Sequence, residues 1–198
     1  MLKHYSLEMI VAGCDESGRG CLAGPVVAAA VILPKGYKNN LINDSKMLSS
    51  KVRYKLAELI KKESISWSVG IASVNEIDTI NIMNASFLAM HRAIKKLYVN
   101  PNLLLIDGNR FNSYPNIVHK CIIKGDGKYI SIAAASIIAK NHRDNIMKGL
   151  DIYFYEYDWK NNKGYPTKKH REALMNLGPT EHHRKSFQLL PSQLSLDI

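Results

Sequence analysis

The sequence predicts an α/β domain whose mixed β-sheet is flanked by helices and followed by a C-terminal helical extension. Apolar segments of strand-like and helix-like character alternate along the chain, which is typical of this class. The first two strand-like segments are close neighbours in the sequence and indicate a hairpin, so the sheet should contain antiparallel as well as parallel strands. From about Asp151 aromatic and basic residues become more frequent, and this shift marks the start of the extension.

Five segments are predicted to be strands. The first ends in two adjacent acids, Asp15 and Glu16. The second is apolar, β-branched at both ends and bounded by Pro25 and Pro34. In chain order the five cover residues 8–16, 25–34, 64–73, 102–108 and 116–126.

Five further segments are predicted to be helices; in the first two the apolar residues recur at helical spacing, and the third is rich in alanine. Ser49 or Ser50 can cap the N-terminus of the first helix, and Gly178 closes a later one. In chain order the helices cover residues 48–64, 85–98, 130–150, 167–178 and, as a short last helix, 180–190.

The chain has 198 residues, of which 46 % are hydrophobic, and this suits one compact domain. We expect a single domain over residues 1–198, with an α/β core at about 1–150 and the helical C-terminal segment at about 151–198. No apolar run is long enough to span a bilayer, and Glu8 interrupts the first one, so we expect neither membrane contact nor an export signal. Three cysteines without CxxC spacing favour the reducing cytosol. We therefore expect a cytoplasmic monomer.

The net charge of +10 comes from 27 Lys and Arg against 17 Asp and Glu. Such a charge attracts polyanions, although a protein can also carry it for solubility alone. Bases gather between residues 160 and 185, where only Glu172 and Glu181 oppose them. They are Lys160, Lys163, Lys168, Lys169, Arg171, Arg184 and Lys185. This stretch is a candidate surface for a nucleic-acid backbone.

Four carboxylates stand where predicted strands end or turns begin: Asp15, Glu16, Asp107 and Asp126. For any one of them, the local preference of acidic residues for turns is an equally good explanation. Because ligands of α/β sheets gather at strand ends, the four can also converge on one site. Clustered carboxylates raise each other's pKa, and a divalent cation removes that repulsion. Oxygen ligands without a Cys or His cluster suit Mg²⁺ or Mn²⁺.

The segment Gly18–Ala23 matches the dinucleotide fingerprint GxGxxG/A, and Asp44 stands about where a ribose-binding acid is expected. That fingerprint must open a helix, whereas the next segment reads as a strand, and the two preceding acids would repel a pyrophosphate. We therefore interpret Gly18, Arg19 and Gly20 as a flexible loop that approaches a phosphodiester beside the metal site. This arrangement suits two-metal phosphoryl transfer.

Seven segments in order resemble ribonuclease HII, the type 2 ribonuclease H of bacteria. They are "AGCDESGRGCLAGPVVAAAVIL", "NDSKMLS", "LLIDGNR", "IIKGD", "SIAAASIIAKNHRD", "KGYPT" and "TEHHRKSF", and they extend from about residue 9 to about residue 188. The resemblance implies a ribonuclease H-like fold, with Mn²⁺ or Mg²⁺ as cofactor. It implies cleavage of RNA in RNA–DNA hybrids and on the 5′ side of single ribonucleotides in duplex DNA, as in ribonucleotide excision repair. The products it implies carry 3′-hydroxyl and 5′-phosphate ends.

The resemblance also implies roles for individual residues. The implied metal ligands and catalytic acids are Asp15, Glu16, Asp107 and, as the fourth acid, Asp126. The implied substrate-binding residues are Gly18, Arg19 and Gly20 at the 2′-hydroxyl, Tyr165 on the following deoxyribose, and Lys46 on the backbone. Ser17, Met47 and the pair Gly127-Lys128 depart from the commonest family residues, but none of them removes a carboxylate or a loop glycine.

From the residues alone, two other functions stay open. A non-catalytic hybrid-binding module would need only the basic face, and metal-dependent turnover distinguishes it from an enzyme. A nicotinamide enzyme would use the GxGxxA loop and would bind NAD. In either case His182 and His183 fit a basic surface facing nucleic acid, and Asp144 fits a helix surface. Arg143 is expected to contact phosphate or solvent.

Overall fold

A five-stranded mixed sheet forms the centre of the molecule, as the sequence predicts. The computed structural model describes residues 2–43 and 49–190, so Lys46 lies outside the described residues. The strand order is β3-β2-β1-β4-β5; β1, β2 and β3 are antiparallel neighbours, whereas β4 runs parallel to both β1 and β5. The strands are β1 (Val11–Ser17), β2 (Val26–Ile32), β3 (Ser66–Ala72), β4 (Leu103–Asp107) and β5 (Val118–Ile122).

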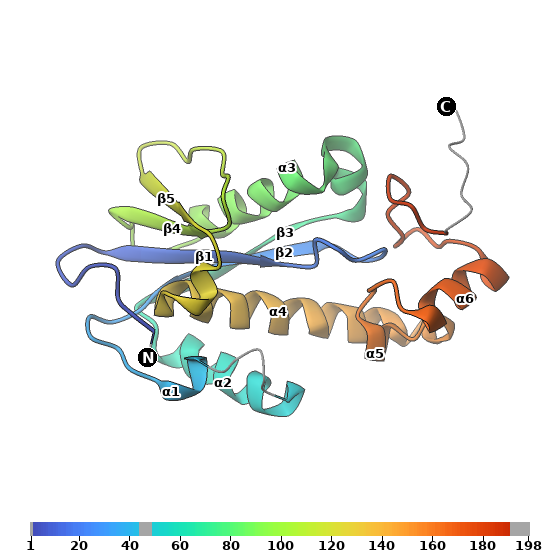
Figure 1. Cartoon of the computed structure of the whole chain (residues 1–198), viewed down its shortest axis with the longest axis horizontal. Coiled ribbons are helices and arrows are strands. Elements are labelled where there is room, and N and C mark those ends of the chain that lie inside the picture. The colour runs from blue at the N-terminus through green and yellow to red at the C-terminus, as the bar shows by residue number, and fades with distance from the viewer. Residues whose placement is uncertain (1, 44–48, 191–198) are drawn as a thin grey trace.

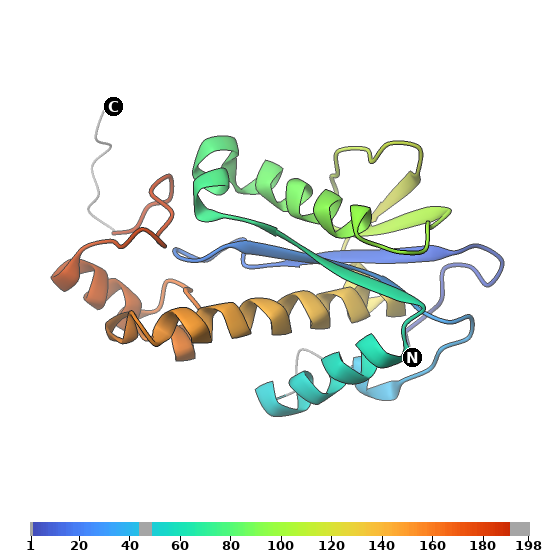
Figure 2. The same ribbon diagram turned by 180° about the vertical axis from the view of Figure 1, so that it is seen from behind.

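Helices cover both faces of this sheet (Figures 1 and 2). Helix α3 packs on one face, and α4 packs on the other with α2 outside it. The helices are α1 (Asn40–Asn43), α2 (Ser50–Glu63), α3 (Val74–Lys95), α4 (Ile130–Asp151), α5 (Trp159–Asn162) and α6 (Lys168–Leu177), with 3-10 turns η2 (Gly125–Gly127) and η3 (Tyr155–Tyr157). None of the helices within the described residues is long and apolar enough to cross a membrane.

The burial of the strands explains their sequence patterns. Every residue of β2 is buried, because helices cover the strand on both sides, and this accounts for its uninterrupted apolar run. On the α4 side the helix lies very close to β1. A Cβ added at Gly13 would stand 2.2 Å from the backbone carbonyl carbon of Ser131, so only glycine permits this approach. The long alanine-rich helix is thereby fixed against the strand that carries the first two acids.

Helix α3 is longer than the predicted helix at residues 85–98. It begins after Ser73, whose hydroxyl accepts a hydrogen bond from the Glu76 N–H at 3.2 Å while the Ser73 N–H donates to the Glu76 carboxylate at 2.9 Å. This is a capping box, and it fixes the start of the helix. The helix is interrupted at Asn81, where φ is 65°. The apolar stripe predicted only the regular second part of the helix.

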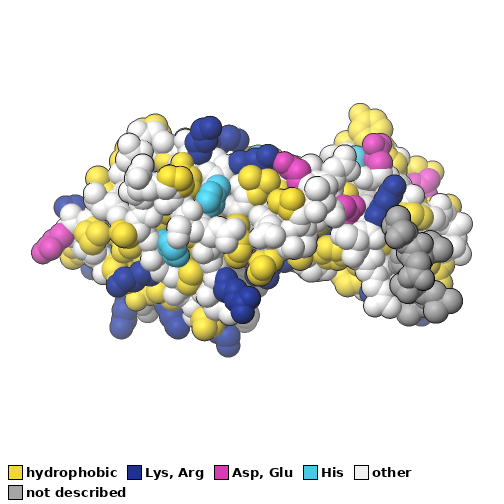
Figure 3. Space-filling view, turned by 90° about the horizontal axis from the view of Figure 1, so that it is seen from above, with side chains coloured by type: hydrophobic (Ala, Val, Ile, Leu, Met, Phe, Trp, Pro, Cys, Tyr) yellow, Lys and Arg dark blue, Asp and Glu magenta, His cyan; other side chains and the backbone are white. Residues whose placement is uncertain are grey.

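The C-terminal extension packs against the far end of α4 (Figure 1). Its buried cluster includes Trp159 together with Met147 of α4 and Leu22 from the loop after β1. Seen from above, the molecule narrows between the sheet-bearing body and this extension (Figure 3). The three helical elements η3, α5 and α6 agree with the helical segment that the sequence predicts.

The predicted short helix at residues 180–190 is wrong. The described part of this segment runs along the loop after β1 and forms an antiparallel bridge between His183 and Ala23. The Arg184 N–H donates to the Leu22 carbonyl at 2.8 Å, and the Gly24 N–H donates to the His182 carbonyl at 2.9 Å. These backbone groups are therefore paired with a distant loop, and an α-helix would have needed them for its own hydrogen bonds.

Candidate active site

Two neighbouring parallel strands bring three acids together. In the pairing of β1 with β4, Cys14 is opposite Ile106, so the next residues, Asp15 and Asp107, stand side by side at the ends of the strands. Glu16 follows on β1, and both Glu16 and Asp107 line a small cavity beneath α3. The sequence prediction that these acids converge at strand ends is therefore met by the sheet register.

Asp15 is the most buried of these acids, with 6 % of its surface exposed. One of its carboxylate oxygens accepts a hydrogen bond from the Glu16 N–H at 2.7 Å. The Ser136 side chain, on α4, also forms a hydrogen bond with the Asp15 carboxyl group. Burial raises the pKa of Asp15 well above its usual range, and the negative charges of Glu16 and Asp107 raise it further. Burial and the two neighbouring negative charges thus disfavour the ionised form of Asp15.

Glu16 is partly neutralised by the loop that follows it. The Arg19 guanidinium donates to its carboxylate at 3.2 Å. Burial raises the pKa of Glu16, while Arg19 opposes that rise and the charge of Asp107 adds to it. Arg19 is exposed, so its side chain can turn toward a ligand without leaving a buried cation unpaired.

The fourth predicted acid, Asp126, lies in η2. The Gly125 N–H donates to Oδ1 of Asp107 at 2.6 Å, which ties this turn to the end of β4. Asp126 is the next residue, and it is half-buried. All four predicted acids therefore come from the same end of the sheet and the turn attached to it.

The chemistry of these acids fits a divalent cation. All four supply only carboxylate oxygens. Burial, and after it the charges of Glu16 and Asp107, raises the pKa of Asp15, and a bound cation would remove the repulsion between these charges. Each side chain also has a protein partner, such as the Gly125 N–H for Asp107 and Arg19 for Glu16. Within residues 2–43 and 49–190, no group of three His, Cys, Asp or Glu is arranged to hold an ion as it stands.

The glycine loop joins β1 to β2 and is held by two buried arginines. The Arg184 guanidinium donates to the carbonyls of Gly18, Arg19 and Gly24 at 2.7–3.0 Å. Arg143 of α4 donates to the carbonyls of Ala23 and Pro25, both at 2.9 Å, and to that of Lys163 at 2.8 Å. The expectations that Arg184 belongs to a nucleic-acid surface and that Arg143 meets phosphate or solvent are wrong, because both side chains are buried beneath the loop.

Tyr165 stands beside the same loop. The Leu22 N–H donates to the carbonyl of Gly164 at 2.8 Å, and the Tyr165 hydroxyl bonds Cys21. Burial raises the pKa of this hydroxyl, although Tyr165 remains 40 % exposed. An exposed aromatic ring next to an exposed glycine loop offers a surface for a sugar or a base.

Comparison with known proteins decides the family. A family model described as Ribonuclease HII matches residues 12–190. The chain belongs to the ribonuclease HII family. The Ribonuclease HII of Bacteroides thetaiotaomicron is 60 % identical to it over 199 residues, with 100 % of both chains covered. That of Bacteroides fragilis is 62 % identical over 190 residues, which cover 96 % of this chain and 94 % of the relative.

Solved structures of the family share the fold. The ribonuclease H2 of Pyrococcus horikoshii OT3 has a TM-score of 0.74 and 25 % identity, over 91 % of this chain and 95 % of that one. The RNase HII of Archaeoglobus fulgidus, solved in a complex with PCNA, has a TM-score of 0.75 and 27 % identity, over 95 % and 98 %. The ribonuclease H-like fold expected from the sequence is therefore confirmed, and this member of the family is an endonuclease acting on RNA–DNA hybrids.

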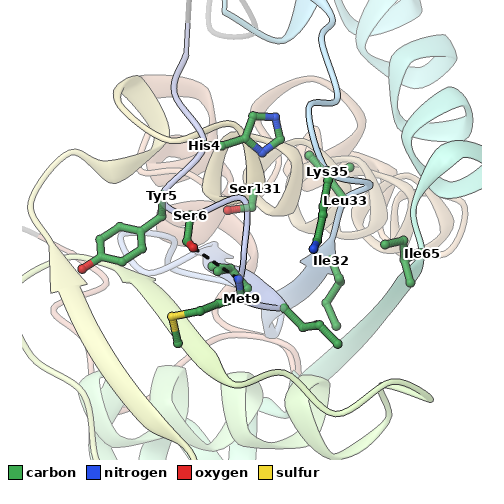
Figure 4. Close-up of a pocket in the computed structure, with 11 residues that line it drawn as sticks. His4, Tyr5, Ser6, Met9, Ile32, Leu33, Lys35, Ile65 and Ser131 are labelled. Carbon is green, nitrogen blue, oxygen red and sulfur yellow. Dashed lines mark hydrogen bonds between the residues drawn. The ribbon is translucent and has the colours of Figure 1, made fainter.

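The nicotinamide alternative has no support in the described structure. Its glycine loop leads into strand β2, so it does not open a helix as the fingerprint requires. The cavity beside Glu16 and Asp107 has a volume of about 40 Å³, far below the several hundred Å³ of cofactor pockets. A second cavity of about 60 Å³ lies at the opposite end of β1, where Ser6 bonds the Met9 N–H (Figure 4). An open acidic site suits a polymeric substrate better than an enclosed small molecule.

Two side chains lie in other settings than the sequence predicts, and one contact with Asp15 has no signal in the sequence. Asp144 is buried rather than on the helix surface, and it accepts a hydrogen bond from Arg53 of α2 at 2.9 Å. His183 is fully buried, so it is not part of a basic surface. Ser136 was not singled out at all, since nothing in an alanine-rich helix marks the one serine that meets Asp15. The remaining bases between residues 160 and 185 are exposed or half-buried.

Proposed function

We propose that this enzyme cuts the RNA strand of RNA–DNA hybrids and also cuts on the 5′ side of single ribonucleotides in duplex DNA, leaving 3′-hydroxyl and 5′-phosphate ends. The observation that carries this proposal is the position of Asp15, Glu16 and Asp107 at adjacent strand ends, directly beside the glycine loop. Carboxylates alone would repel a phosphodiester, whereas carboxylates that hold cations would bind it. Cutting at single ribonucleotides would place the enzyme in ribonucleotide excision repair.

The cofactor we propose is Mg²⁺ or Mn²⁺. The residues that would hold it are Asp15, Glu16, Asp107 and Asp126. When bound, divalent cations lower the pKa of an attacking water and stabilise the leaving 3′-oxygen. Asp15 and Asp107 keep their positions through the strands, and the Gly125 N–H orients Asp107. The oxygen-only donor set and the raised pKa of Asp15 support this assignment.

For the substrate, we propose that Gly18, Arg19 and Gly20 contact the ribose 2′-hydroxyl and the adjoining phosphate. Tyr165 packs on the following deoxyribose, and Lys46 contacts the backbone. The 2′-hydroxyl both donates and accepts hydrogen bonds, and it is the group that distinguishes RNA from DNA at a given nucleotide. Basic side chains predominate over acidic ones on the sheet-bearing body (Figure 3), which favours a duplex lying across it. The sequence further favours a monomer in the cytoplasm.

A cleavage assay tests this function. Two labelled DNA duplexes of one sequence, with and without a single internal ribonucleotide, are incubated with the protein and Mn²⁺, Mg²⁺ or EDTA. We expect a single cut on the 5′ side of the ribonucleotide with either cation, and none with EDTA or in the all-DNA duplex. Cutting in EDTA would contradict the metal assignment. Absence of a cut at the ribonucleotide with either cation would contradict the recognition of single ribonucleotides.

A further inference from the structure

A buried arginine determines which way the glycine loop faces. Arg184 lies in the irregular segment after α6 and is 0 % exposed. Its Nη2 donates to the Gly18 carbonyl at 2.7 Å, and its Nη1 donates to the Arg19 carbonyl at 2.9 Å. Its Nε and Nη2 both donate hydrogen bonds to the Gly24 carbonyl, at 3.0 and 2.9 Å. One planar guanidinium thus binds the tip and the far end of the same loop.

The direction of these carbonyls fixes the direction of the neighbouring N–H groups. The peptides that follow Gly18 and Arg19 are trans, so each N–H points opposite to the carbonyl of its own peptide. With the carbonyls of Gly18 and Arg19 turned inward to Arg184, the N–H groups of Arg19 and Gly20 face outward. Both residues are exposed, and a Cβ added at Gly20 would meet nothing within 4 Å. Two adjacent donors therefore face open space next to Glu16.

Burying the charged Arg184 guanidinium in this position costs free energy. Among the ion pairs of the described residues, none joins a carboxylate to Arg184 or to Arg143. Peptide carbonyls hold both buried cations, and the Arg184 guanidinium also lies 5.1 Å from the centre of the Phe187 ring. Burial lowers the pKa of Arg184 to about 10, which reflects that cost. A buried ionic group does not by itself indicate that the protein gains stability from it. Such a group can instead select one conformation of the backbone around it.

His183, the residue before Arg184, is linked by hydrogen bonds to the turn that carries Tyr165, the second element proposed to contact the substrate. His183 accepts the Thr180 N–H at Nδ1, so its Nε2 carries the proton and donates to Nε2 of His170 at 3.1 Å. The same nitrogen of His170 also accepts the Trp159 indole N–H at 3.0 Å. His170 in turn donates from Nδ1 to the Tyr165 carbonyl at 2.9 Å. Because side chains alternate in extended chain, one dipeptide holds the glycine loop on one side and the Tyr165 turn on the other.

We propose that Arg184 is a positioning residue for ribose recognition: by holding the carbonyls of Gly18 and Arg19 inward, it presents the N–H groups of Arg19 and Gly20 to oxygen acceptors of the ribonucleotide. The inference rests on the proposed contact between this loop and the substrate, and it adds the residue that makes the contact specific. Arg184 does not touch the substrate. Its loss leaves the carboxylates in place but lets the loop peptides rotate, so discrimination between ribose and deoxyribose falls.

The test compares binding preferences without cleavage. In an Asp107→Asn background, affinities are measured for the duplex with one ribonucleotide and for the all-DNA duplex. Arg184→Lys keeps the charge but cannot form the planar fork. We expect it to reduce the preference for the ribonucleotide duplex about tenfold, which corresponds to one or two lost hydrogen bonds. Ile60→Ala, in the core beneath α2, is the control for lowered stability, and it should keep the preference of the parent.

Three outcomes are distinguishable. If Arg184→Lys keeps the parent's preference within about twofold, the inference is overturned while the proposed function stands. If the parent itself has no preference and the wild-type enzyme does not cut at the ribonucleotide, the proposed function has failed and the inference falls with it. If Arg184→Lys does not fold, the amide NMR signals of Arg19 and Gly20 in the Asp107→Asn protein decide. They should shift with the ribonucleotide duplex and not with the all-DNA duplex, and unchanged signals would overturn the inference.

Discussion

The Gly125 N–H donates a 2.6 Å hydrogen bond to Oδ1 of Asp107, and this contact links the end of β4 to the turn that carries Asp126. It leaves the second oxygen of Asp107 for another partner. The hydrogen bond attaches to the end of β4 the turn with Asp126, which stands 19 positions farther along the chain and belongs to no strand.

Asp107→Asn should abolish most turnover while preserving the fold. The amide Oδ1 can still accept the Gly125 N–H, so η2 stays attached, but the neutral side chain binds a cation weakly. Because a bound cation supplies several kcal/mol of transition-state stabilisation, we expect a loss of at least about a hundredfold in single-turnover rate. Rates with Mg²⁺ and Mn²⁺ and binding of an uncleaved hybrid are the measurements. A variant with the wild-type rate would show that Asp107 is not a ligand.

Replacing Gly18 with alanine should lower the stability of the protein, whereas replacing Gly20 should not. Gly18 has φ of 101°, and a Cβ there would lie 2.1 Å from Nε of Arg143, so Gly18→Ala should destabilise the protein by about 2 kcal/mol or more. Gly20 has open space around its Cβ position, so Gly20→Ala should leave the melting temperature nearly unchanged. Its methyl group would nevertheless occupy the proposed substrate side.

The measurement for this pair is thermal unfolding together with kcat/KM on the duplex with one ribonucleotide. Gly20→Ala serves as its own stability control, because any loss of activity comes without a loss of folded protein. If Gly20→Ala cuts this duplex as fast as the wild type, the ligand does not approach the loop from that side.

The sequence predicts the acidic site better than the support beneath it. A short apolar strand followed by an acid is a local pattern, so Asp15 and Asp107 could be found from neighbouring residues alone. Arg143 and Arg184 have no such local signal, because a buried arginine and an exposed one look alike in sequence. Their burial depends on carbonyls from a loop more than a hundred residues away. The segment after α6 was predicted to be helical for the same reason: its partner is distant.

Arg53 and Asp144 form an ion pair between α2 and α4 that should be strongly coupled. Their side chains are 13 % and 8 % exposed, and Lys140 stands 3.8 Å from the other Asp144 oxygen. Arg53→Met leaves a buried carboxylate with only that distant partner, so we expect a loss of about 3 kcal/mol in the free energy of unfolding. Adding Asp144→Asn to Arg53→Met removes the buried negative charge and should restore part of the lost free energy of unfolding. Urea unfolding of both single variants and the double variant gives the coupling, and strict additivity would contradict it.

His183 should make the stability depend on pH between about 6.5 and 4. Burial, with the charges of His170 and His182, lowers its pKa from 6.5 to about 4 in the folded protein. Because the unfolded chain takes up the proton first, the contribution of His183 is fully present above pH 6.5 and is lost as the pH falls toward 4. Between pH 7.5 and 5 we expect a loss of about 2 kcal/mol from this group.

Other groups titrate in the same interval, and the raised pKa of Asp15 acts in the opposite direction, since the folded protein holds that proton more tightly. The test is therefore a difference between two proteins. Urea unfolding of the wild type and of His183→Asn is compared at pH 7.5 and 5, and the carboxylates are common to both. The wild type should lose about 2 kcal/mol more than the variant on acidification. Equal losses would show that the buried imidazole is protonated in the folded protein as easily as in the unfolded chain.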